Sequence, residues 1–385
     1  MKKKSVGFLF LGPISHIYHS ISIAFHLSNY PDFDVTLFVS SELNLKLVNT
    51  ISKSYKYHQC EIEYLYPSIL HKALRLFKKR AHPRVRNVLQ NNKNKLINFD
   101  ALVLTDRHFI NGGRKKPFYF LTGHGAGDRA RGFTDTMKKF DFIFVSGKEK
   151  WQRMAKLNYI SEERGCIIGY PKFEIVSLKK KNGTLFKNNN PIVLYNPHFN
   201  KNETSWYLWG EQILNFFLNN KNYNLIFAPH LILFSKETEP IDTKYYHSKN
   251  IHIDINSHAL VDMTYTIAAD IYLGDVSSQV YEFVGYKKRP CIFLNPHHAE
   301  WQDNSSFRMW KMGDVIDTMD NFEQALLKSE TTHPLFYHIQ KELIENTFST
   351  TEQSAGKRGA DAIVAFFEKN RTDCRSALCD NSLAR

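Results

Sequence analysis

The sequence IYLGDVSSQVYEFVGY, residues 271–286, predicts a buried strand, a tight turn and a helix in succession. Its first apolar run ends at Gly274 and Asp275, and apolar residues then recur at helical spacing. A helix start leaves backbone N–H groups unpaired and carries partial positive charge, so Ser277 and Ser278 can bind a phosphate or simply cap the helix. The end of a parallel strand is where ligands bind in open α/β sheets, which favours the phosphate site.

Short apolar runs alternate with helical segments along the rest of the chain. This alternation predicts α/β architecture in each half, with a parallel sheet covered by helices on both faces. We expect strands at Val6–Phe10, Val35–Val39, Ala101–Leu104, Phe118–Leu121 and Phe142–Val145 in the first half, and at Ile192–Tyr195, Asn224–Phe227, Ile251–Ile253, Ile271–Leu273 and Cys291–Leu294 in the second. The predicted fold is two doubly wound, Rossmann-like domains that face each other across a ligand-binding cleft.

The polar run KKKNGTLFKNNN indicates where the two domains are joined. We expect an N-terminal domain at 1–178, a linker at 179–190 and a C-terminal domain at 191–370. The tail 371–385 is polar and without periodicity, so we expect it to be disordered.

Composition points to a cytoplasmic protein with anionic partners. The 385 residues include 51 Lys and Arg against 38 Asp and Glu, a formal charge of +13. The five cysteines form no CxxC pair, which is typical of reduced thiols. No apolar run approaches the roughly 20 residues that span a bilayer, and the start of the chain is interpreted as a strand and not a signal peptide.

A glycine-rich loop, LTGHGAGDR at 121–129, follows one of the first-half strands. Its glycines allow a close approach to a ligand, and His124 can take a proton from an attacking hydroxyl near neutral pH. Asp128 is expected to orient His124, while Arg129 and Arg131 are candidates for phosphate or acceptor contacts. The alternative is a turn histidine bonded within its own loop.

Two histidines follow strands of the second half, His198 in Asn196-Pro197-His198 and His230 in Ala228-Pro229-His230. We expect His230 to stabilise a leaving diphosphate, with Asn196, His198, Gly274 and Asp275 on the same donor-binding edge. No two histidines lie at i, i+4 beside a carboxylate, so we expect no metal site, and no phosphate-binding ATPase loop is present.

Together these segments resemble the CDP-glycerol glycerophosphotransferases, the teichoic-acid primase and polymerase group of the GT-B fold. The likeness runs from about residue 121 to 367 and is carried by Gly123-His124-Gly125, Gly169-Tyr170-Pro171-Lys172, Leu194-Tyr195-Asn196-Pro197-His198, His230, Gly274-Asp275-Val276-Ser277-Ser278 and Ser354-Ala355-Gly356-Lys357-Arg358. Gly123 stands where the family has tryptophan, Leu231 where it has proline, and Val276 where an aromatic residue is usual.

The resemblance implies transfer of an alcohol phosphate from a CDP-activated donor to a hydroxyl of a glycan or lipid-linked acceptor, with no further cofactor. It implies that His124 is the base, that His230, Ser277 and Ser278 hold the diphosphate, and that the acceptor binds the first domain. A glycosyltransferase that uses a nucleotide sugar would need the same cleft and stays open as the alternative. A nucleic-acid-binding protein ranks last, because the aromatic residues fall in strand and helix patterns.

The basic run HKALRLFKKRAHPRVR at 71–86 can form a helix up to Ala81, with Pro83 as its stop. An ordinary solvated face is the simple interpretation. Because a lipid-linked acceptor lies at a membrane, we also expect peripheral binding to the inner face of the cell membrane through Lys72, Arg75, Lys78, Lys79, Arg80, Arg84 and Arg86.

Overall fold

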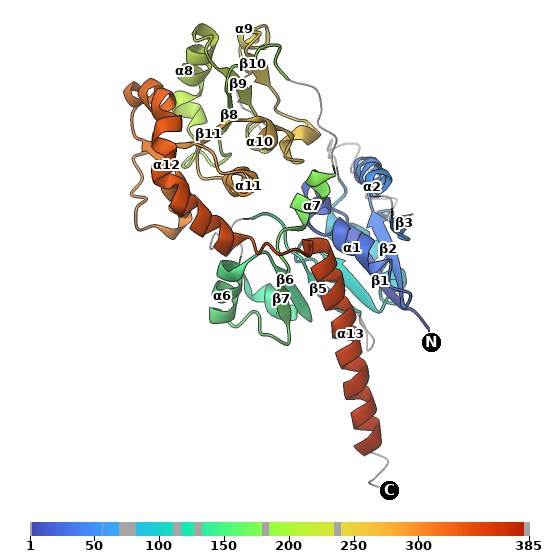
Figure 1. Cartoon of the computed structure of the whole chain (residues 1–385). Helices are drawn as coiled ribbons and strands as arrows, with labels where there is room; N and C mark the ends of the chain where they lie inside the picture. The colour runs from blue at the N-terminus through green and yellow to red at the C-terminus, as the bar shows by residue number, and fades with distance from the viewer. Residues whose placement is uncertain are drawn as a thin grey trace. The chain divides into compact units, whose positions relative to one another are not determined.

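The structure is a computed structural model of the chain (Figure 1). It describes residues 2–55, 57–68, 82–110, 117–126, 133–178, 185–234 and 240–380, the last ten by their backbone alone. The described residues form two compact units, each built on its own parallel sheet.

The first sheet has the strand order β3-β2-β1-β4-β5-β6-β7, and all its pairs are parallel. Its strands are β1 (Lys4–Phe10), β2 (Phe33–Val39), β3 (Glu61–Tyr64), β4 (Ala101–Leu104), β5 (Phe118–Leu121), β6 (Phe142–Val145) and β7 (Gly165–Ile167). All five predicted strands of this half are present. They could be predicted because a strand buried on both faces needs a continuous apolar run.

Helices cover both faces of this sheet. The elements between the strands are η1 (Ile14–His19), α1 (Ile21–Leu27), α2 (Glu42–Ser54), α4 (Val85–Asn91), α5 (Lys93–Leu96), η3 (Asp135–Lys139), α6 (Lys148–Lys156) and α7 (Pro171–Ser177). Because side chains alternate along a strand, Tyr119 and Leu121 pack in one apolar cluster with Val88 of α4, while Phe120 contacts the other layer.

The second sheet has the order β10-β9-β8-β11-β12-β13 and is also parallel. Its strands are β8 (Ile192–Asn196), β9 (Asn224–Phe227), β10 (Ile251–Ile253), β11 (Ile271–Gly274), β12 (Cys291–Leu294) and β13 (Asp314–Ile316). The surrounding elements are α8 (Trp206–Asn219), α9 (Thr243–Tyr246), η4 (His258–Leu260), α10 (Thr264–Ala268), α11 (Gln279–Tyr286), η5 (Ser305–Met312), η6 (Met319–Asn321) and α12 (Phe322–Thr347). All five predicted strands of this half are present.

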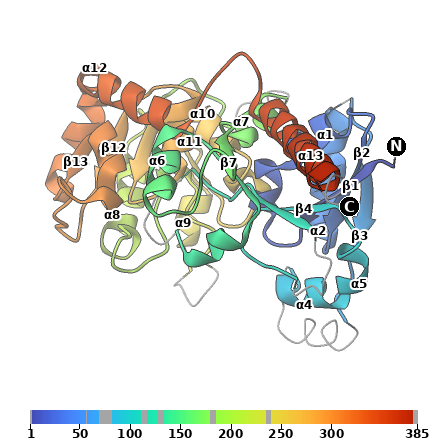
Figure 2. The ribbon, with the colours of Figure 1, turned by 90° about the horizontal axis from the view of Figure 1, so that it is seen from below.

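The end of the chain belongs to the first unit, which differs from the predicted domain at 191–370. Unit 1 comprises the described residues within Met1–Gly125, Phe133–Lys179 and Phe348–Arg385, and unit 2 those within Ala126–Gly132 and Lys180–Thr347. The reason is α13 (Ala355–Asp380), which lies beside α1 in both views (Figure 1, Figure 2). Its Phe366 and Phe367 pack on Phe118, with centroids 5.0 and 5.9 Å away.

The backbone of α13 is helical as far as Asp380, whereas disorder was predicted from residue 371. Residues 381–385 lie outside the described part of the chain. Of the predicted linker 179–190, residues 179–184 also lie outside it, and 185–190 contain neither helix nor strand.

In each sheet the order in which the chain adds strands changes direction once. The chain builds β1, β2 and β3 outward and then returns to place β4 on the other side of β1; likewise β11 is placed on the free side of β8. Ligands bind at such switch points, beyond the carboxyl ends of the strands. We therefore expect ligand-binding residues in the loops after β1 and β4 in unit 1, and after β8 and β11 in unit 2.

Candidate active site

The carboxyl ends of β1, β4 and β5 bring three histidine-bearing segments together in unit 1. After β1 the chain enters η1, which carries His16 and His19, and after β5 it forms the glycine loop that carries His124. Gly123 and Gly125 of this loop have φ values of +67° and +80°. Only glycine adopts such values without strain, so the glycines fix the sharp bend that exposes His124.

The His124 ring is oriented by a backbone carbonyl. Its Nδ1 lies 2.8 Å from the carbonyl oxygen of Thr105, the residue that follows β4. Because a carbonyl only accepts hydrogen bonds, Nδ1 carries the proton and donates it. In the neutral ring Nε2 is then the nitrogen with a lone pair, as a general base requires.

Two buried histidines contact the His124 loop, and the sequence analysis did not single them out. The His16 ring stacks on the His124 ring at a centroid distance of 4.1 Å and an interplanar angle of 20°. The Nε2 of His19 accepts a hydrogen bond of 3.2 Å from the backbone N–H of Gly125. The available signal was their position directly after the first strand, at the edge that also holds His124.

A small cavity of about 10 Å³, the size of one water molecule, lies behind this loop. It is lined by residues in and after β6, by residues after β5 and β7, and by His19 of η1 and Lys150 of α6; the full set is His19, Thr122, His124, Gly125, Phe144, Val145, Ser146, Lys150, Ile168, Gly169, Tyr170 and Pro171. A Cβ atom on Gly123 would lie 3.6 Å from the Nζ of Lys150, an ordinary van der Waals distance. Glycine at this position is therefore required by its φ of +67° and not by lack of space.

In unit 2, three of the predicted donor-binding residues are buried parts of the scaffold. Asn196 donates from Nδ2 to the carbonyl of Ala228 and accepts from the hydroxyl of Tyr272, so it ties three strand ends together. A Cβ on Gly274 would lie 2.9 Å from the carbonyl oxygen of Asn196, which explains why glycine is needed where β8 and β11 meet. These two residues shape the edge at which β8 and β11 meet.

Asp275 is fully buried, and its carboxylate holds the loop after β8. Its Oδ2 accepts hydrogen bonds from the backbone N–H groups of His198 and Ser205, at 2.9 and 3.0 Å. Burial raises the pKa of Asp275 to about 6, although these hydrogen bonds pull in the opposite direction. Asp275 therefore fixes the position of His198 through the loop backbone.

His198 and His230 lie close together at the ends of β8 and β9. Their ring centroids are 5.7 Å apart, and the exposed Phe199 ring lies 4.4 and 4.6 Å from them. His198 is buried, with its Nδ1 3.2 Å from a carboxylate oxygen of Glu203, whereas His230 is half-buried. His230 is therefore the more accessible of the two donor-side histidines.

The two serines at the start of α11 differ in accessibility. Ser277 is buried, and its hydroxyl accepts a hydrogen bond of 3.3 Å from the backbone N–H of Gln279, so it caps the helix. Ser278 is exposed and makes no side-chain cap. In this structure Ser277 caps the helix, and Ser278 has the exposure that the predicted phosphate contact requires.

Several predicted site residues lie outside the described part of the chain. These are Asp128, Arg129 and Arg131 of the glycine loop, and Lys72, Arg75, Lys78, Lys79 and Arg80 of the basic run. Arg84 and Arg86 are described, and both are exposed where α4 begins. Among the described residues, no group of three or more His, Cys, Asp or Glu side chains is arranged to hold a metal ion. No helix in the described ranges is long and apolar enough to cross a membrane.

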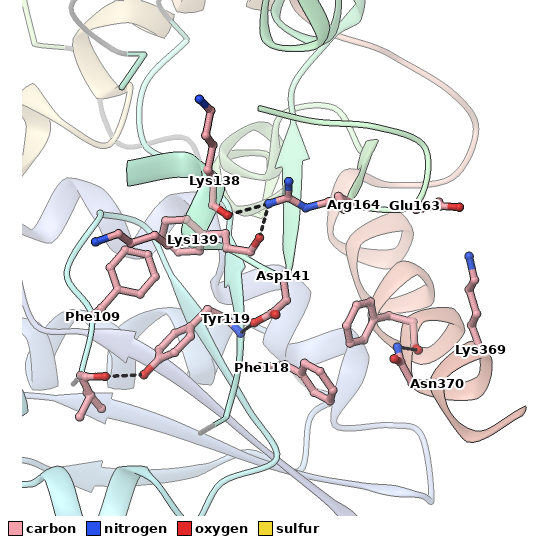
Figure 3. A pocket seen from close by; sticks show the side chains of 13 residues that line it. Phe109, Phe118, Tyr119, Lys138, Lys139, Asp141, Glu163, Arg164, Lys369 and Asn370 are labelled. Atoms are coloured by element: carbon pink, nitrogen blue, oxygen red, sulfur yellow. Dashed lines mark hydrogen bonds between the residues drawn. The ribbon is translucent and has the colours of Figure 1, made fainter. Parts of the chain in front are cut away.

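A larger hollow of about 780 Å³ opens at the opposite edge of the first sheet (Figure 3). Its walls come from the amino-terminal ends of β5, β6 and β7 and from α13, and include Phe118, Asp141, Arg164 and Phe366. The Arg164 guanidinium donates to the carbonyls of Lys138 and Phe140, and the Asp141 carboxylate accepts from the backbone N–H of Tyr119. No histidine is found among the described residues that line it, and the candidate general base His124 lies at the other edge.

Two units, each built on a parallel sheet covered by helices, are the architecture of the GT-B fold. Solved structures with the same fold resemble this chain over most of its length. The wall teichoic acid polymerase TagF, in a crystal soaked with CDPG, has a TM-score of 0.63 at 14% identity, over 97% of this chain and 90% of that one. A UDP-N-acetylglucosamine 2-epimerase has a TM-score of 0.61 at 12% identity, over 96% of this chain and 97% of that one. The UDP-GlcNAc 2-epimerase from Neisseria meningitidis, bound to UDP-GlcNAc, has a TM-score of 0.55 at 12% identity, over 95% of this chain and 100% of that one.

The family is identified by sequence. Residues 116–363 match the family model of CDP-glycerol:poly(glycerophosphate) glycerophosphotransferase, and the chain therefore belongs to that family. It is a transferase, and its membership favours a CDP-activated alcohol over a nucleotide sugar as donor. No protein of curated function is similar enough in sequence to count as a match.

Proposed function

We propose that this enzyme transfers glycerol phosphate from CDP-glycerol to a hydroxyl group of a glycan or lipid-linked acceptor during cell-surface polysaccharide synthesis. The observation that carries the assignment of the base is the hydrogen bond from His124 Nδ1 to the Thr105 carbonyl, which leaves Nε2 as the basic nitrogen. Family membership supports the donor, and the likeness to the wall teichoic acid polymerase TagF supports the class of acceptor.

In the proposed step, the acceptor hydroxyl oxygen attacks the phosphorus that carries glycerol. A new P–O bond forms, the P–O–P bond of the diphosphate breaks, and CMP leaves. The hydroxyl proton passes to Nε2 of His124. Because such transition states are loose, positioning and charge stabilisation supply most of the acceleration.

The donor side of the proposal rests on His230, Ser278 and the start of α11. His230 is half-buried and adjoins His198, and Ser278 is exposed at a helix start that carries partial positive charge. These groups supply hydrogen-bond donors where negative charge grows on the departing CMP. The reaction requires that one donor molecule reach both His124 and these groups.

The remaining predicted contacts keep the status of proposals. Asp128, Arg129 and Arg131 follow His124 directly in the sequence, where they could orient the base and meet acceptor or donor phosphates. A peripheral location at the inner face of the cell membrane follows from the lipid-linked acceptor. We expect no cofactor beyond the activated donor.

The direct test is a panel of CDP-glycerol, other CDP-alcohols, UDP-sugars and CMP-sugars, each offered with a hydroxyl acceptor. We expect CMP from CDP-glycerol, together with an acceptor product that has gained glycerol phosphate. Because CMP-sugars also release CMP, product mass decides between the two donor classes. Release of UDP from a UDP-sugar, with no turnover of any CDP-alcohol, would show that the enzyme is a glycosyltransferase.

A further inference from the structure

We propose that His16 and His19 form a clamp that holds His124 from two sides and fixes which of its nitrogens acts as the base. Neither residue contacts the reacting atoms in this proposal; both are positioning residues. The inference rests on the proposed role of His124, but the geometry of the clamp can be tested without any substrate.

The clamp follows from the geometry of η1. A 3₁₀-helix has three residues per turn, so side chains three positions apart lie on the same side. His16 and His19 have this spacing within Ile14–His19, and both side chains are buried, with 8% and 6% of their surface exposed. One short helix thus presents two imidazoles to the loop that follows β5.

The His16 half of the clamp is a stacking contact. The nearly parallel rings of His16 and His124, 4.1 Å apart, restrict tilting of the His124 ring. The Nδ1 of His16 is buried and has no hydrogen-bond partner among the described residues, although buried polar atoms are normally satisfied. An unpaired buried nitrogen costs stability, so His16 is not explained by a contribution to folding. Its flat ring face instead supports the ring of His124.

The His19 half of the clamp is a hydrogen bond to the loop backbone. Its Nε2 accepts from Gly125 N–H, one residue beyond His124, so His19 must carry its own proton on Nδ1. The His19 ring also meets the buried Tyr170 edge-on at 5.3 Å, which holds it in place. The stacking contact and this hydrogen bond therefore reach the loop at adjacent residues.

Both clamp histidines are neutral at physiological pH. Burial lowers the pKa of His16 to about 3, and the nearby His124 adds to this effect. Burial likewise places the pKa of His19 well below its ordinary value, with the positive charges of Lys172 and Lys150 acting in the same direction. Neutrality suits the clamp, because a protonated His19 could not accept from Gly125.

With the Thr105 carbonyl on Nδ1, the three contacts restrain the tilt, the rotation and the backbone of His124. Loss of either clamp contact frees the ring to exchange tautomers or to swing away from Thr105. Catalysis by a general base is sensitive to such displacement, since a misplacement of about 1 Å can cost about 10²-fold in rate.

Matched pairs of variants separate the loss of a positioning contact from the general effect of substituting a buried side chain. His16→Phe keeps a flat ring and His16→Leu removes it; His19→Gln keeps an acceptor near the position of Nε2 and His19→Met removes it. We expect kcat for CMP release to fall about 10²-fold in His16→Leu and His19→Met, with the donor KM almost unchanged. His16→Phe and His19→Gln should recover most of this loss. His252→Gln, at a histidine bonded to Tyr265 in unit 2, is the control.

Long-range ¹H–¹⁵N spectra of histidine-labelled, ligand-free protein provide the substrate-independent readout. The wild type should show His124 protonated on Nδ1, and His16→Leu and His19→Met should show mixed tautomers. An unchanged His124 tautomer in both variants would overturn the clamp, as would equal loss of kcat within each matched pair. If the wild type releases no CMP from CDP-glycerol, the proposed function fails, while the tautomer result still decides the clamp.

Discussion

At the scale of single residues, the candidate site divides into exposed groups that can react and buried groups that shape the loops. His124 and Ser278 are exposed, whereas Asn196, Gly274 and Asp275 are buried. Asn196 and the Oδ2 of Asp275 bond to backbone groups, and the Oδ1 of Asp275 has no hydrogen-bond partner among the described residues. This division decides what a substitution does. A change at an exposed group alters chemistry with little effect on folding, and a change at a buried group does the reverse.

His124→Ala should abolish turnover while leaving the fold intact. The side chain is exposed, and the change removes its hydrogen bond to Thr105 and its stacking contact with His16 but no part of the sheet, so the fold should persist. Removal of a general base costs about 10²–10⁴-fold in rate. Initial rates of CMP release and a melting curve check both parts. A folded His124→Ala enzyme with near wild-type kcat would remove His124 from the mechanism; His247→Ala, at an exposed histidine of unit 2, is the control.

Asp275 should make stability depend on pH between about 4 and 6. Its pKa is raised to about 6 in the folded state, so in this interval the folded protein retains a proton that the unfolded chain releases. The free energy of unfolding due to this group therefore decreases as pH rises through the interval. Urea denaturation of the wild type and Asp275→Asn at several pH values isolates the effect. The difference between the two should shrink toward higher pH, and a constant difference would contradict the assignment.

The sequence predicted the strand ends but not the orientation of the side chains there. Position after a strand was the reason for choosing His124, His230 and the serines, whose roles stay predictions. Whether a side chain then points to solvent or into the scaffold depends on partners distant in sequence, such as Tyr272 for Asn196. His16 and His19 were missed because they read as polar interruptions of an apolar start.

At the scale of elements, α11 combines a folding signal and a binding signal at its first turn. The buried Ser277 bonds to the N–H of Gln279, and the exposed Ser278 occupies the N-cap position without a side-chain bond. The helix therefore does not need the Ser278 side chain as its cap, and this exposed hydroxyl stays the predicted phosphate contact.

Single substitutions should separate the two serines. Ser277→Ala should lower the free energy of unfolding by about 1 kcal/mol, the usual value of a cap, with little effect on donor binding. Ser278→Ala should weaken CDP-glycerol binding by about 1.5–3 kcal/mol, the value of a hydrogen bond to a charged group, without lowering the melting temperature. Calorimetric titration and thermal unfolding measure the two quantities. If Ser278→Ala binds the donor normally, the start of α11 is only a helix start.

The strands that the sequence did not predict have a common physical character. β3, β7 and β13 lie at sheet edges and contain three or four residues each. β3 reads EIEY and is mostly half-exposed, so it lacks the continuous apolar run of a central strand. An edge strand needs burial on fewer sides, and for this reason its sequence carries a weaker signal.

At the scale of the whole molecule, the chain returns to its first unit at the end. Ala360 and Ile363 of α13 are fully buried, and Phe366 and Phe367 pack on aromatic residues of the first sheet. This pairing joins segments more than 200 residues apart, and no local pattern announces it. The sequence predicted residues up to 370 in the second domain, because the partner of α13 could be identified only in the folded structure.

The net charge of +13 bears on where the enzyme works. A lipid-linked acceptor requires the enzyme to reach the bilayer surface, and each Lys or Arg near an anionic leaflet contributes about 1 kcal/mol. Arg84 and Arg86, the last two of the seven Lys and Arg in the basic run 71–86, are exposed at the start of α4, and the other five lie outside the described residues. Seven cations in one short stretch are enough for reversible binding.

We therefore predict sedimentation with anionic vesicles that is lost at high salt, because screening shortens the reach of surface charge. Charge reversal of Lys78, Lys79 and Arg80 to Glu should weaken this binding without changing activity on a short soluble acceptor. The matched control reverses Lys287, Lys311 and Lys328, three exposed lysines of unit 2, and gives the same change in net charge. Since the two triple variants differ only in the location of the charge, equal loss in both would assign binding to net charge alone. Equal sedimentation of the wild type with neutral and anionic vesicles would leave the basic run as an ordinary solvated face.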